Sequence, residues 1–459
     1  GMEERILDRF ERYHLIGIGG ISMSALAKLL ILCGKKVSGS DLADSALLAE
    51  LRTMGAEIHV GHSAAYLADA QCVVFTSAVK PGHPELSEAI RRGLCVMERH
   101  KLLSALSECY NRVIAVAGTH GKTTTTAMLG EVFCAGGADP TVHLGGRDAA
   151  LGGNLRAGGA DCFITEACEY RRSFLSLKPD IGIILNVDWD HPDCYASLGD
   201  VVEAFQAYAD RCKKLIVNAD CEACRSLRHP DCVTFGVFHQ ADFCAVLKNE
   251  QRGGSDFDVY AYGKKLFTVE SGVYGLHNVY NALAAAAAAT VCGLPAEGIR
   301  SGLHGFRGVD RRFERLGKYG HFTVISDYAH HPQEIKSLLA MTKDLSERFL
   351  CVFQPHTYSR TLSLISSFAE SFRGAEAVAI LPVYAAREDY IPNLDEFLAF
   401  QVGRQGTPAV CCKGEKELCA WLEGFPDVDV LLMVGAGDID ELARRLAAGQ
   451  VGNGADGKS

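Results

Sequence analysis

Short apolar segments alternate with amphipathic helical patterns along most of the 459-residue chain. The alternation starts with the stretch YHLIGIGGISMSALAKLLILCG, and new apolar segments begin at RVIAVAG and at FTVISDY. Strands that are apolar on both faces need a cover on both sides, and intervening helices supply it over a parallel sheet. The pattern therefore predicts an α/β fold.

Three groups of strands and helices can be separated along the chain. A usual size of about 150 residues per domain also predicts roughly three domains for this length. We expect one α/β domain over residues 1–108, a second over 109–309 and a third over 310–459. Within the second, residues 242–271 alternate polar and apolar side chains, which predicts a small antiparallel addition to the sheet.

The charge and the hydropathy of the chain restrict its partners. The formal net charge is -10, whereas sequence-independent binding of nucleic acid requires a basic face. No apolar segment reaches the roughly 18 residues that cross a bilayer. The first residues, GMEERILDRF, have no apolar signal core. We therefore expect a cytoplasmic protein that has no nucleic-acid or membrane partner.

The eighteen cysteines are scattered, and many lie inside apolar segments. In a long chain without a leader, such residues are expected to be reduced and buried. One group has a composition that zinc accepts: Cys212, Cys221, Cys224, His229 and Cys232. Its irregular spacing and the acids around it favour a structural interpretation, and zinc stays as the alternative.

The segment VAGTHGKTTTTAML, residues 116–129, connects a predicted strand to a predicted helix. Its GKT end fits the phosphate loop G-x-x-x-x-G-K-[ST], although Val116 replaces the first glycine. The backbone N–H groups of such a turn and the helix dipole bind phosphate, while Lys122 neutralises it and the Thr123 hydroxyl holds Mg²⁺. Four threonines cost a helix about 2 kcal/mol of propensity, so we expect their hydroxyls to serve this site rather than only a helix cap.

Carboxylates and one histidine follow the two apolar segments CFI and IGIIL. These residues are Glu166, Glu169, Asp188, Asp190, His191 and Asp193. Because ligands gather at the carboxyl ends of parallel strands, we expect these side chains to face the phosphate loop. Hard oxygen ligands with one imidazole suit divalent ions. Solvated acidic loops are the alternative.

The loop AGTHGKTTT resembles that of the Mur ligases and their folylpolyglutamate synthetase relatives, which are ATP-dependent amide-forming ligases. The resemblance implies Rossmann-like outer domains and a central P-loop ATPase-like domain. It assigns catalysis to Lys122, Glu166, His191 and His330, and two Mg²⁺ ions to Thr123, Glu166 and His191. The residues that it assigns to ATP are Gly118, Thr119, His120, Gly121, Lys122, Thr123, Thr124, Asn278, Asn281, Arg312 and Asp327.

Two asparagines in GLHNVYNALAA are three residues apart, and therefore on one helical face. An asparagine amide matches N6 and N7 of adenine in a bidentate pair. The family motif G-x-H-N favours Asn278 for this contact and makes Asn281 its neighbour. Taken alone, an asparagine on a helix is more often a cap or a surface residue.

The segment GIGGISMS could be a dinucleotide fingerprint, but Ser22 occupies the third glycine position. It resembles instead the family branch that adds L-alanine to UDP-N-acetylmuramate, as do DYAHHPQEI and FQPHTYSRT. Three positions depart from that pattern: His83, Ser326 and Thr357. The residues that the resemblance assigns to the substrates are Gly17, Gly19, Gly20, Ser22, Asp41, Thr76, Ser77, Asn154, Glu169, Tyr328, His356 and Arg360.

The implied reaction activates a carboxylate as an acyl phosphate, which the amine of L-alanine then attacks. Either His330 or Asp193 is expected to deprotonate the amine. Domains joined near Asn111 and Gly308 would close to exclude water. A tripeptide-recycling ligase of the same family, or a non-catalytic nucleotide-binding module, stays as the alternative, and the sequence leaves monomer and homodimer open.

Overall fold

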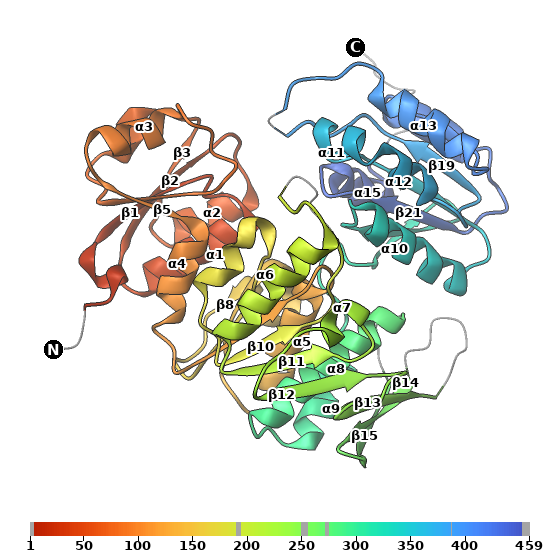
Figure 1. The fold of residues 1–459 in the computed structure, drawn as a ribbon. Coiled ribbons are helices and arrows are strands. Elements are labelled where there is room, and N and C mark those ends of the chain that lie inside the picture. Colours follow the sequence, from red (N-terminus) through yellow and green to blue (C-terminus); the bar gives the residue numbers. More distant parts are fainter. Residues whose placement is uncertain (1–3, 190–193, 249–255, 271–274, 387, 452–459) are drawn as a thin grey trace. The chain divides into compact units, whose positions relative to one another are not determined.

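The computed structural model describes residues 4–189, 194–248, 256–270, 275–386 and 388–451. The chain divides into two compact units, the first ending at Arg307 and the second beginning at Gly308. The first unit contains two sheets and the second contains one (Figure 1). The predicted α/β class is confirmed, and the predicted domain boundaries stay a prediction.

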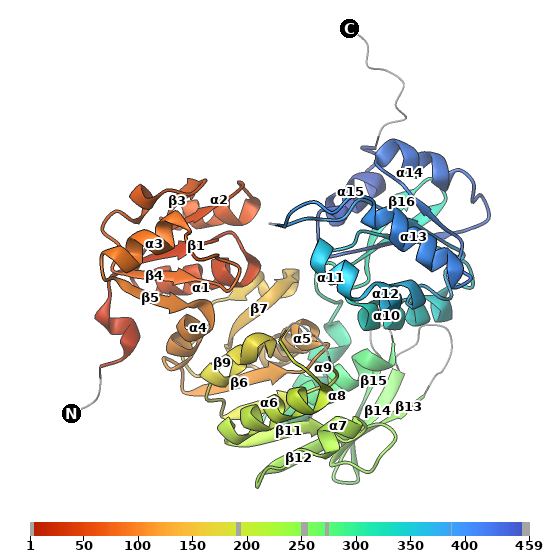
Figure 2. The ribbon, with the colours of Figure 1, turned by 45° about the horizontal axis from the view of Figure 1, so that its top comes forward.

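The first sheet has five parallel strands in the order β3-β2-β1-β4-β5. Its strands are β1 (Arg12–Ile16), β2 (Lys36–Asp41), β3 (Glu57–Val60), β4 (Cys72–Phe75) and β5 (Cys95–Glu98). Its helices are η1 (Ile6–Arg9), α1 (Ile21–Leu32), α2 (Ala46–Thr53), η2 (Ala64–Leu67), α3 (Pro84–Arg91) and α4 (Arg99–Ser107). Four of the five residues of β1 are buried because helices cover the sheet (Figure 2). The glycine-rich segment turns from β1 into α1 at Gly17, whose φ of +77° favours glycine.

The second sheet has ten strands in the order β15-β14-β13-β12-β11-β10-β6-β9-β7-β8. They are β6 (Arg112–Ala117), β7 (Thr141–Asp148), β8 (Gly153–Arg156), β9 (Cys162–Glu166), β10 (Ile181–Ile184), β11 (Lys214–Asn218), β12 (Cys232–Gly236), β13 (Phe243–Leu247), β14 (Asp256–Ala261) and β15 (Lys264–Glu270). The predicted antiparallel addition is confirmed, because β14 pairs antiparallel with both β13 and β15. The helices of this part are α5 (Lys122–Ala135), η3 (Ala149–Leu151), η4 (Tyr170–Ser176), α6 (Leu198–Arg211), α7 (Glu222–Arg225), α8 (Leu276–Val291) and α9 (Ala296–Gly305).

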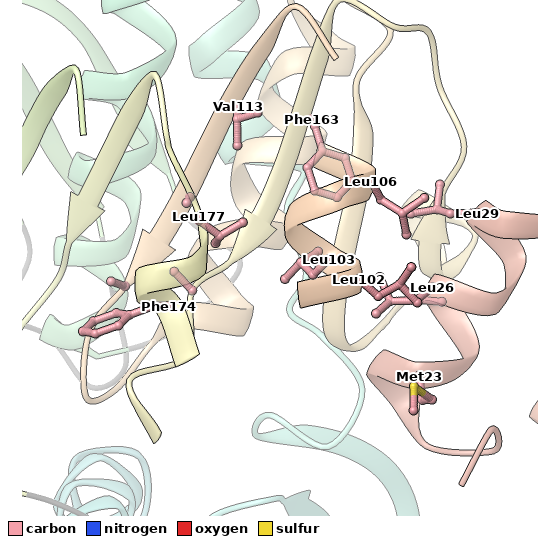
Figure 3. Packing of buried hydrophobic residues seen from close by; sticks show 14 of the residues in the cluster. Met23, Leu26, Leu29, Leu102, Leu103, Leu106, Val113, Phe163, Phe174 and Leu177 are labelled. Carbon is pink, nitrogen blue, oxygen red and sulfur yellow. The ribbon is translucent and has the colours of Figure 1, made fainter. Parts of the chain in front are cut away.

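One apolar core continues from the first sheet into the second. Figure 3 shows Leu26 on α1 and Leu102 and Leu106 on α4 in the same cluster as Val113 and Phe163 of the second sheet. Each fully buried leucine contributes about 1.5–3 kcal/mol relative to an exposed one. The predicted joint near Asn111 therefore lies inside one packed unit.

The second unit is built on a six-stranded sheet in the order β16-β17-β21-β18-β19-β20. Its strands are β16 (Glu314–Tyr319), β17 (Phe322–Asp327), β18 (Phe349–Phe353), β19 (Ala377–Ile380), β20 (Ala409–Cys411) and β21 (Val430–Val434). Its helices are α10 (Pro332–Leu345), α11 (Tyr358–Ser363), α12 (Ile365–Glu370), α13 (Leu394–Arg404), α14 (Glu415–Leu422) and α15 (Ile439–Ala447). Only the β16–β17 pairing is antiparallel among the pairings of these strands. A separate apolar cluster forms its core.

Within the described ranges, every helix is too short or too polar to cross a membrane. All eighteen cysteines are free thiols, but only six are buried, and Cys33 and Cys232 are exposed, so the expectation of burial holds for only part of them. The cysteine and histidine group around residue 221 lies wholly in the described part of the chain, and no three of its members bring ligand atoms close enough to share an ion. Cys212, for example, is buried with its thiol donating to the Tyr208 carbonyl.

Candidate active site

The phosphate loop connects β6 to α5, as the sequence predicts. Gly121 precedes the helix with a left-handed φ of +88°, and a Cβ atom there would lie 2.7 Å from Oδ1 of Asn281. The backbone N–H of His120 donates to Oδ1 of Asn186 at 2.8 Å, and Nδ2 of Asn186 donates to the His120 carbonyl at 2.9 Å. Asn186, which the sequence analysis missed, therefore fixes the loop. The first-turn N–H groups of α5 have no partner within the helix, which suits an anion.

Lys122 is the first residue of α5 and forms an ion pair with Glu169. Its Nζ lies 3.0 Å from Glu169 Oε2 and donates to the Gly118 carbonyl at 2.7 Å. The exposed fractions of the two side chains are 17% for Lys122 and 2% for Glu169. Burial is the largest single effect and lowers the pKa of Lys122, but the charge and hydrogen bond of Glu169, together with the charges of Cys168 and Glu166, raise it by more, so the amine is held in its charged form. The structure thus brings these two predicted site residues together.

Thr123 and Glu166 also come together beside the loop. The Thr123 hydroxyl donates to Glu166 Oε1 at 2.8 Å, and the backbone N–H of Gly145 donates to the other oxygen of that carboxylate. A Cβ atom on Gly145 would lie 2.6 Å from Glu166 Oε2, and one on Gly146 would lie 2.9 Å from Cγ2 of Thr123. The glycine pair in LGGRD is the signal that the sequence analysis missed. His191, Asp190 and Asp193 lie outside the described residues.

The other threonines of α5 have different surroundings. Thr125 and Thr126 are fully buried, and the Thr126 hydroxyl donates to the Lys122 carbonyl at 2.7 Å. The expectation that all four hydroxyls serve the phosphate site therefore needs correction: those of Thr125 and Thr126 lie in the protein interior. Thr123 is the threonine whose hydroxyl contacts the site acid.

The two asparagines of α8 lie next to the phosphate loop. Nδ2 of Asn281 donates to Oδ1 of Asn278 at 3.2 Å. Asn281 is 4% exposed and lies against Gly121, so it is not the ordinary surface residue that its position on a helix suggests. Asn278, half-buried, is the outer member of the pair.

The glycine-rich turn after β1 is connected to the end of β2. The N–H of Gly19 donates to Oδ2 of Asp41 at 2.8 Å, and a Cβ atom on Gly19 would lie 2.7 Å from the same oxygen. The Thr76 hydroxyl accepts from the N–H of Ala78 at 3.3 Å. The structure therefore places three of the predicted nucleotide-sugar loops at the carboxyl ends of neighbouring strands.

A chain of hydrogen bonds connects this turn to the acid beside the phosphate loop. Arg99 donates to the Ser22 hydroxyl at 2.7 Å, which lies 2.9 Å from Nε2 of His143. Nδ1 of His143 lies 2.8 Å from the Thr165 hydroxyl, which donates to the Glu166 carbonyl at 3.1 Å. The donors align in one direction only if Ser22 donates to Nε2 and His143 carries its proton on Nδ1. Burial first, and then the charge of Arg99, lower the pKa of His143 to about 3, which keeps the ring neutral.

Asn154 occupies a different environment from the other predicted substrate residues. It is fully buried, its Nδ2 donates to the Ile21 carbonyl and to the Ser24 hydroxyl at 2.8 Å each, and its Oδ1 accepts from Lys28 at 2.7 Å. These contacts attach β8 to α1. A substrate atom would have to displace one of them.

In the second unit, Asp327 ends β17 and is 9% exposed. Its carboxylate accepts from the N–H groups of Phe313 and Ala329 at 2.8 Å each. Burial raises its pKa to about 6, against the lowering effect of Arg312. The guanidinium of Arg312 lies over the ring of Tyr328, 5.1 Å from its centroid. Ser326, which replaces a second acid, donates its hydroxyl proton to Asp440 at 2.7 Å.

Two histidine rings lie together in this unit. The centroids of His330 and His356 are 5.8 Å apart, and His356 stacks on Tyr384, a residue that the sequence analysis missed, at 5.3 Å. Burial is the main cause that lowers the pKa of His330. For His356, burial and then the charges of His330 and Arg360 lower the pKa to about 4. Nδ1 of His330 donates to the Tyr328 carbonyl at 3.1 Å, so Nε2 of the neutral ring carries a lone pair.

Three family models match the chain in succession. They are described as the Mur ligase family catalytic domain (residues 12–110), the Mur ligase middle domain (116–289) and the Mur ligase glutamate ligase domain (311–437).

Several curated proteins are similar over nearly the whole chain. The UDP-N-acetylmuramate–L-alanine ligase of Clostridium novyi is 40% identical over 441 residues, which are 94% of this chain and 96% of that protein. The ligase of the same name from Alkaliphilus metalliredigens is 40% identical over 451 residues, which are 96% and 98% of the two chains.

Two solved structures of ligases are also similar over nearly the whole chain. A UDP-N-acetylmuramate–alanine ligase from Thermotoga maritima has a TM-score of 0.81 and 32% identity, with 95% of this chain and 98% of that chain covered. A murein peptide ligase from Psychrobacter arcticus has a TM-score of 0.74 at 24% identity, covering 97% and 100%, and this likeness shows the fold alone.

Proposed function

The chain belongs to the Mur ligase family, and from this membership we propose that it joins L-alanine to the lactyl carboxylate of UDP-N-acetylmuramate. ATP is cleaved to ADP and phosphate, and the product is UDP-N-acetylmuramoyl-L-alanine, a cytoplasmic peptidoglycan precursor. The similarity to ligases of that name over 94–96% of the chain carries the proposal. The domain boundaries at residues 108/109 and 309/310 belong to the same proposal.

The phosphate loop supports a role in ATP binding. Lys122 is charged and mostly buried at the start of α5, where the helix dipole also attracts anions. Asn278 and Asn281 lie beside the loop and are assigned to adenine. Arg312 and Asp327 are assigned to the phosphates and the ribose on the family resemblance.

Thr123 and Glu166 fit a Mg²⁺ ion, because their hydroxyl and carboxylate oxygens converge at 2.8 Å and are the hard donors that this ion prefers. His191 is proposed as a ligand of a second ion. A bound metal ion would neutralise part of the negative charge of the phosphates. Gly145 holds Glu166 in orientation through its N–H group.

In the proposed first step, the substrate carboxylate attacks the γ-phosphorus of ATP, the bond to the β–γ bridging oxygen breaks, and an acyl phosphate and ADP form. Lys122 moves from Glu169 toward the γ-phosphate and stabilises the developing charge. Oriented binding brings the reactants together and water is excluded, since the acyl phosphate hydrolyses readily. Gly17, Gly19, Gly20, Asp41, Thr76 and Ser77 are assigned to the sugar nucleotide.

In the second step, the neutral amine of L-alanine attacks the acyl carbon and phosphate leaves. The guanidinium of Arg360 is assigned to the carboxylate of L-alanine, which it can bind bidentately. His330 is assigned the role of the base that takes the proton from the ammonium group of L-alanine. Its lowered pKa keeps the ring neutral at neutral pH, and its Nε2 has a lone pair that can accept the proton.

Product analysis tests the proposal directly. The chain is incubated with ATP, Mg²⁺ and UDP-N-acetylmuramate, with either L-alanine or the tripeptide L-Ala-γ-D-Glu-diaminopimelate as amine. We expect release of ADP and a new sugar nucleotide, by mass spectrometry, only with L-alanine. Product only with the tripeptide would identify the recycling ligase instead, and ADP release independent of either substrate would contradict both assignments.

A further inference from the structure

We propose that His62, His83 and Glu85 form a binding site for a transition-metal ion of the Zn²⁺ type, in addition to the ATP site. One ligand atom from each of these side chains lies within 4.8 Å of the other two. His62 follows β3, and His83 immediately precedes α3, whose second residue is Glu85. The inference is independent of the proposed ligase activity.

The carboxylate of Glu85 is the fixed member of this group. It is fully buried and its Oε2 lies 2.8 Å from Nδ1 of His62. Its Oε1 accepts from the Ser40 hydroxyl at 2.6 Å and lies 2.5 Å from Nε2 of the fully buried His14. Ordered partners behind a ligating carboxylate are typical of metal sites, where they fix its orientation.

The charge around Glu85 also favours a cation. The two carboxylate oxygens accept hydrogen bonds from three side chains, those of His14, Ser40 and His62, which stabilise a negative charge in the interior. Among the described residues, its ion-pair partners are the two histidines, whose positive charge is not permanent. A divalent cation would take the place of the proton between His62 Nδ1 and Glu85.

Two imidazoles and one carboxylate select among metals. Imidazole nitrogen is a good ligand for Zn²⁺, Co²⁺ and Ni²⁺, while Mg²⁺ prefers a set of ligands that is mostly oxygen, and two imidazoles out of three ligands disfavour it. Metal–ligand bonds of about 2.0–2.2 Å in a tetrahedral site put the ligand atoms about 3.4 Å apart. His62 and Glu85 already lie within that distance at 2.8 Å, and His83, whose ligand atom lies within 4.8 Å of theirs, reaches it by a shift of at most about 1.4 Å. The bound ion would tie the loop after β3 to the start of α3.

Nδ1 of His83 accepts the N–H of Glu85 at 3.1 Å, and a metal ion would take the single lone pair of the neutral ring in place of this N–H. The His83→Asn variant is the sharpest test, because the asparagine oxygen can still accept that N–H while the imidazole ligand is lost. The untagged full-length chain is dialysed against Zn²⁺ or Co²⁺ with Mg²⁺ in excess, and bound metal is measured by mass spectrometry. We expect the wild type to bind about one equivalent more than the variant. His304→Asn, an exposed histidine of the same unit, is the matched control and should bind as the wild type does.

Two further measurements complete the test. The Co²⁺ spectrum should show nitrogen and oxygen ligands, and Ser40→Ala, which loses a hydrogen bond behind Glu85, should bind about 10- to 100-fold more weakly. Zn²⁺ should raise the unfolding temperature of the wild type but not that of His83→Asn. If His83→Asn does not fold in chelator, His62→Asn replaces it. Equal uptake by wild type and variant, or thiolate charge-transfer bands, would overturn the proposal.

Discussion

Lys122 and Glu169 depend on each other at the scale of single residues. Glu169 is 2% exposed, so its charge requires the amine 3.0 Å away. A buried ion pair contributes little net stability, but removal of one member leaves an uncompensated charge in the interior. Variants of the two residues can therefore separate the effect of the ion pair on activity from its effect on stability.

Lys122→Met should lower both activity and stability. We expect ligase activity to fall by at least about 100-fold, since charge stabilisation at the γ-phosphate is lost. The loss of the cation beside the buried Glu169 carboxylate should cost about 3–5 kcal/mol of unfolding free energy. ADP release and urea unfolding measure the two effects.

The double variant Lys122→Met, Glu169→Gln is the control for that prediction. It should recover most of the stability, because the second change removes the buried charge, while activity stays lost. A double variant as unstable as the single one would show that the ion pair is not the cause.

His143 should make the first unit sensitive to acid. Its pKa is about 3 in the folded state and about 6.5 in the unfolded chain. Because the folded pKa is the lower one, the stabilising contribution is complete above about pH 6.5 and declines as the pH falls toward 3. At about pH 5 the loss should be about 2 kcal/mol.

Urea unfolding of the wild type and of His143→Gln at pH 7.5 and pH 5 checks this expectation. Glutamine keeps one donor and one acceptor but does not titrate, so the stability difference between the proteins should shrink at the lower pH. A constant difference would mean that His143 does not titrate on unfolding.

At the scale of elements, the sequence predicts β6, α5, β9, β17 and α8 well, because each has strong apolar periodicity and a polar residue or glycine at its end. The contact of Gly145 with Glu166 could not be predicted. It depends on β7 lying beside β9. The local sequence pattern predicts a strand but does not show which other strand it pairs with. The same holds for Tyr384, which lies in the loop after β19 and pairs with His356 through an isolated β-bridge.

Gly145→Ala tests how the end of β7 supports the site. The added methyl group would meet Oε2 of Glu166 at 2.6 Å, so the carboxylate must move or the strand must shift. We expect a loss of about 1–3 kcal/mol in stability and a weaker apparent affinity for Mg²⁺ in the ADP-release assay. Gly305→Ala, with open space around its Cβ position, is the control and should retain both properties.

At the scale of the whole molecule, the first and second sheets share a core while the third has its own. The sequence shows where α/β units begin again but not how strongly they pack, because the seam is made by long-range contacts such as Lys28 with Asn154. Of the two joints expected from the sequence, the one near Asn111 lies within the first unit, and the one near Gly308 coincides with the division between the two compact units.

Closure about that joint is expected when substrates bind, since the acyl phosphate must be kept from water. Small-angle scattering should show a smaller radius of gyration with a non-hydrolysable ATP analogue and UDP-N-acetylmuramate together than with either alone. An unchanged radius would contradict closure. A disulfide-free chain allows the measurement under reducing conditions.

The salt bridge at the start of α5 has a consequence for which anions the enzyme can admit. The ammonium group of Lys122 is already paired with the Glu169 carboxylate. Inorganic phosphate that binds Lys122 therefore replaces one anionic partner by another and gains little binding free energy. Drawing the ammonium group away from that carboxylate has a cost, and a nucleoside triphosphate, which carries more negative charge than inorganic phosphate and also binds through its base, can offset it. The resting enzyme should thus discriminate against the inorganic phosphate that it produces, which limits product inhibition.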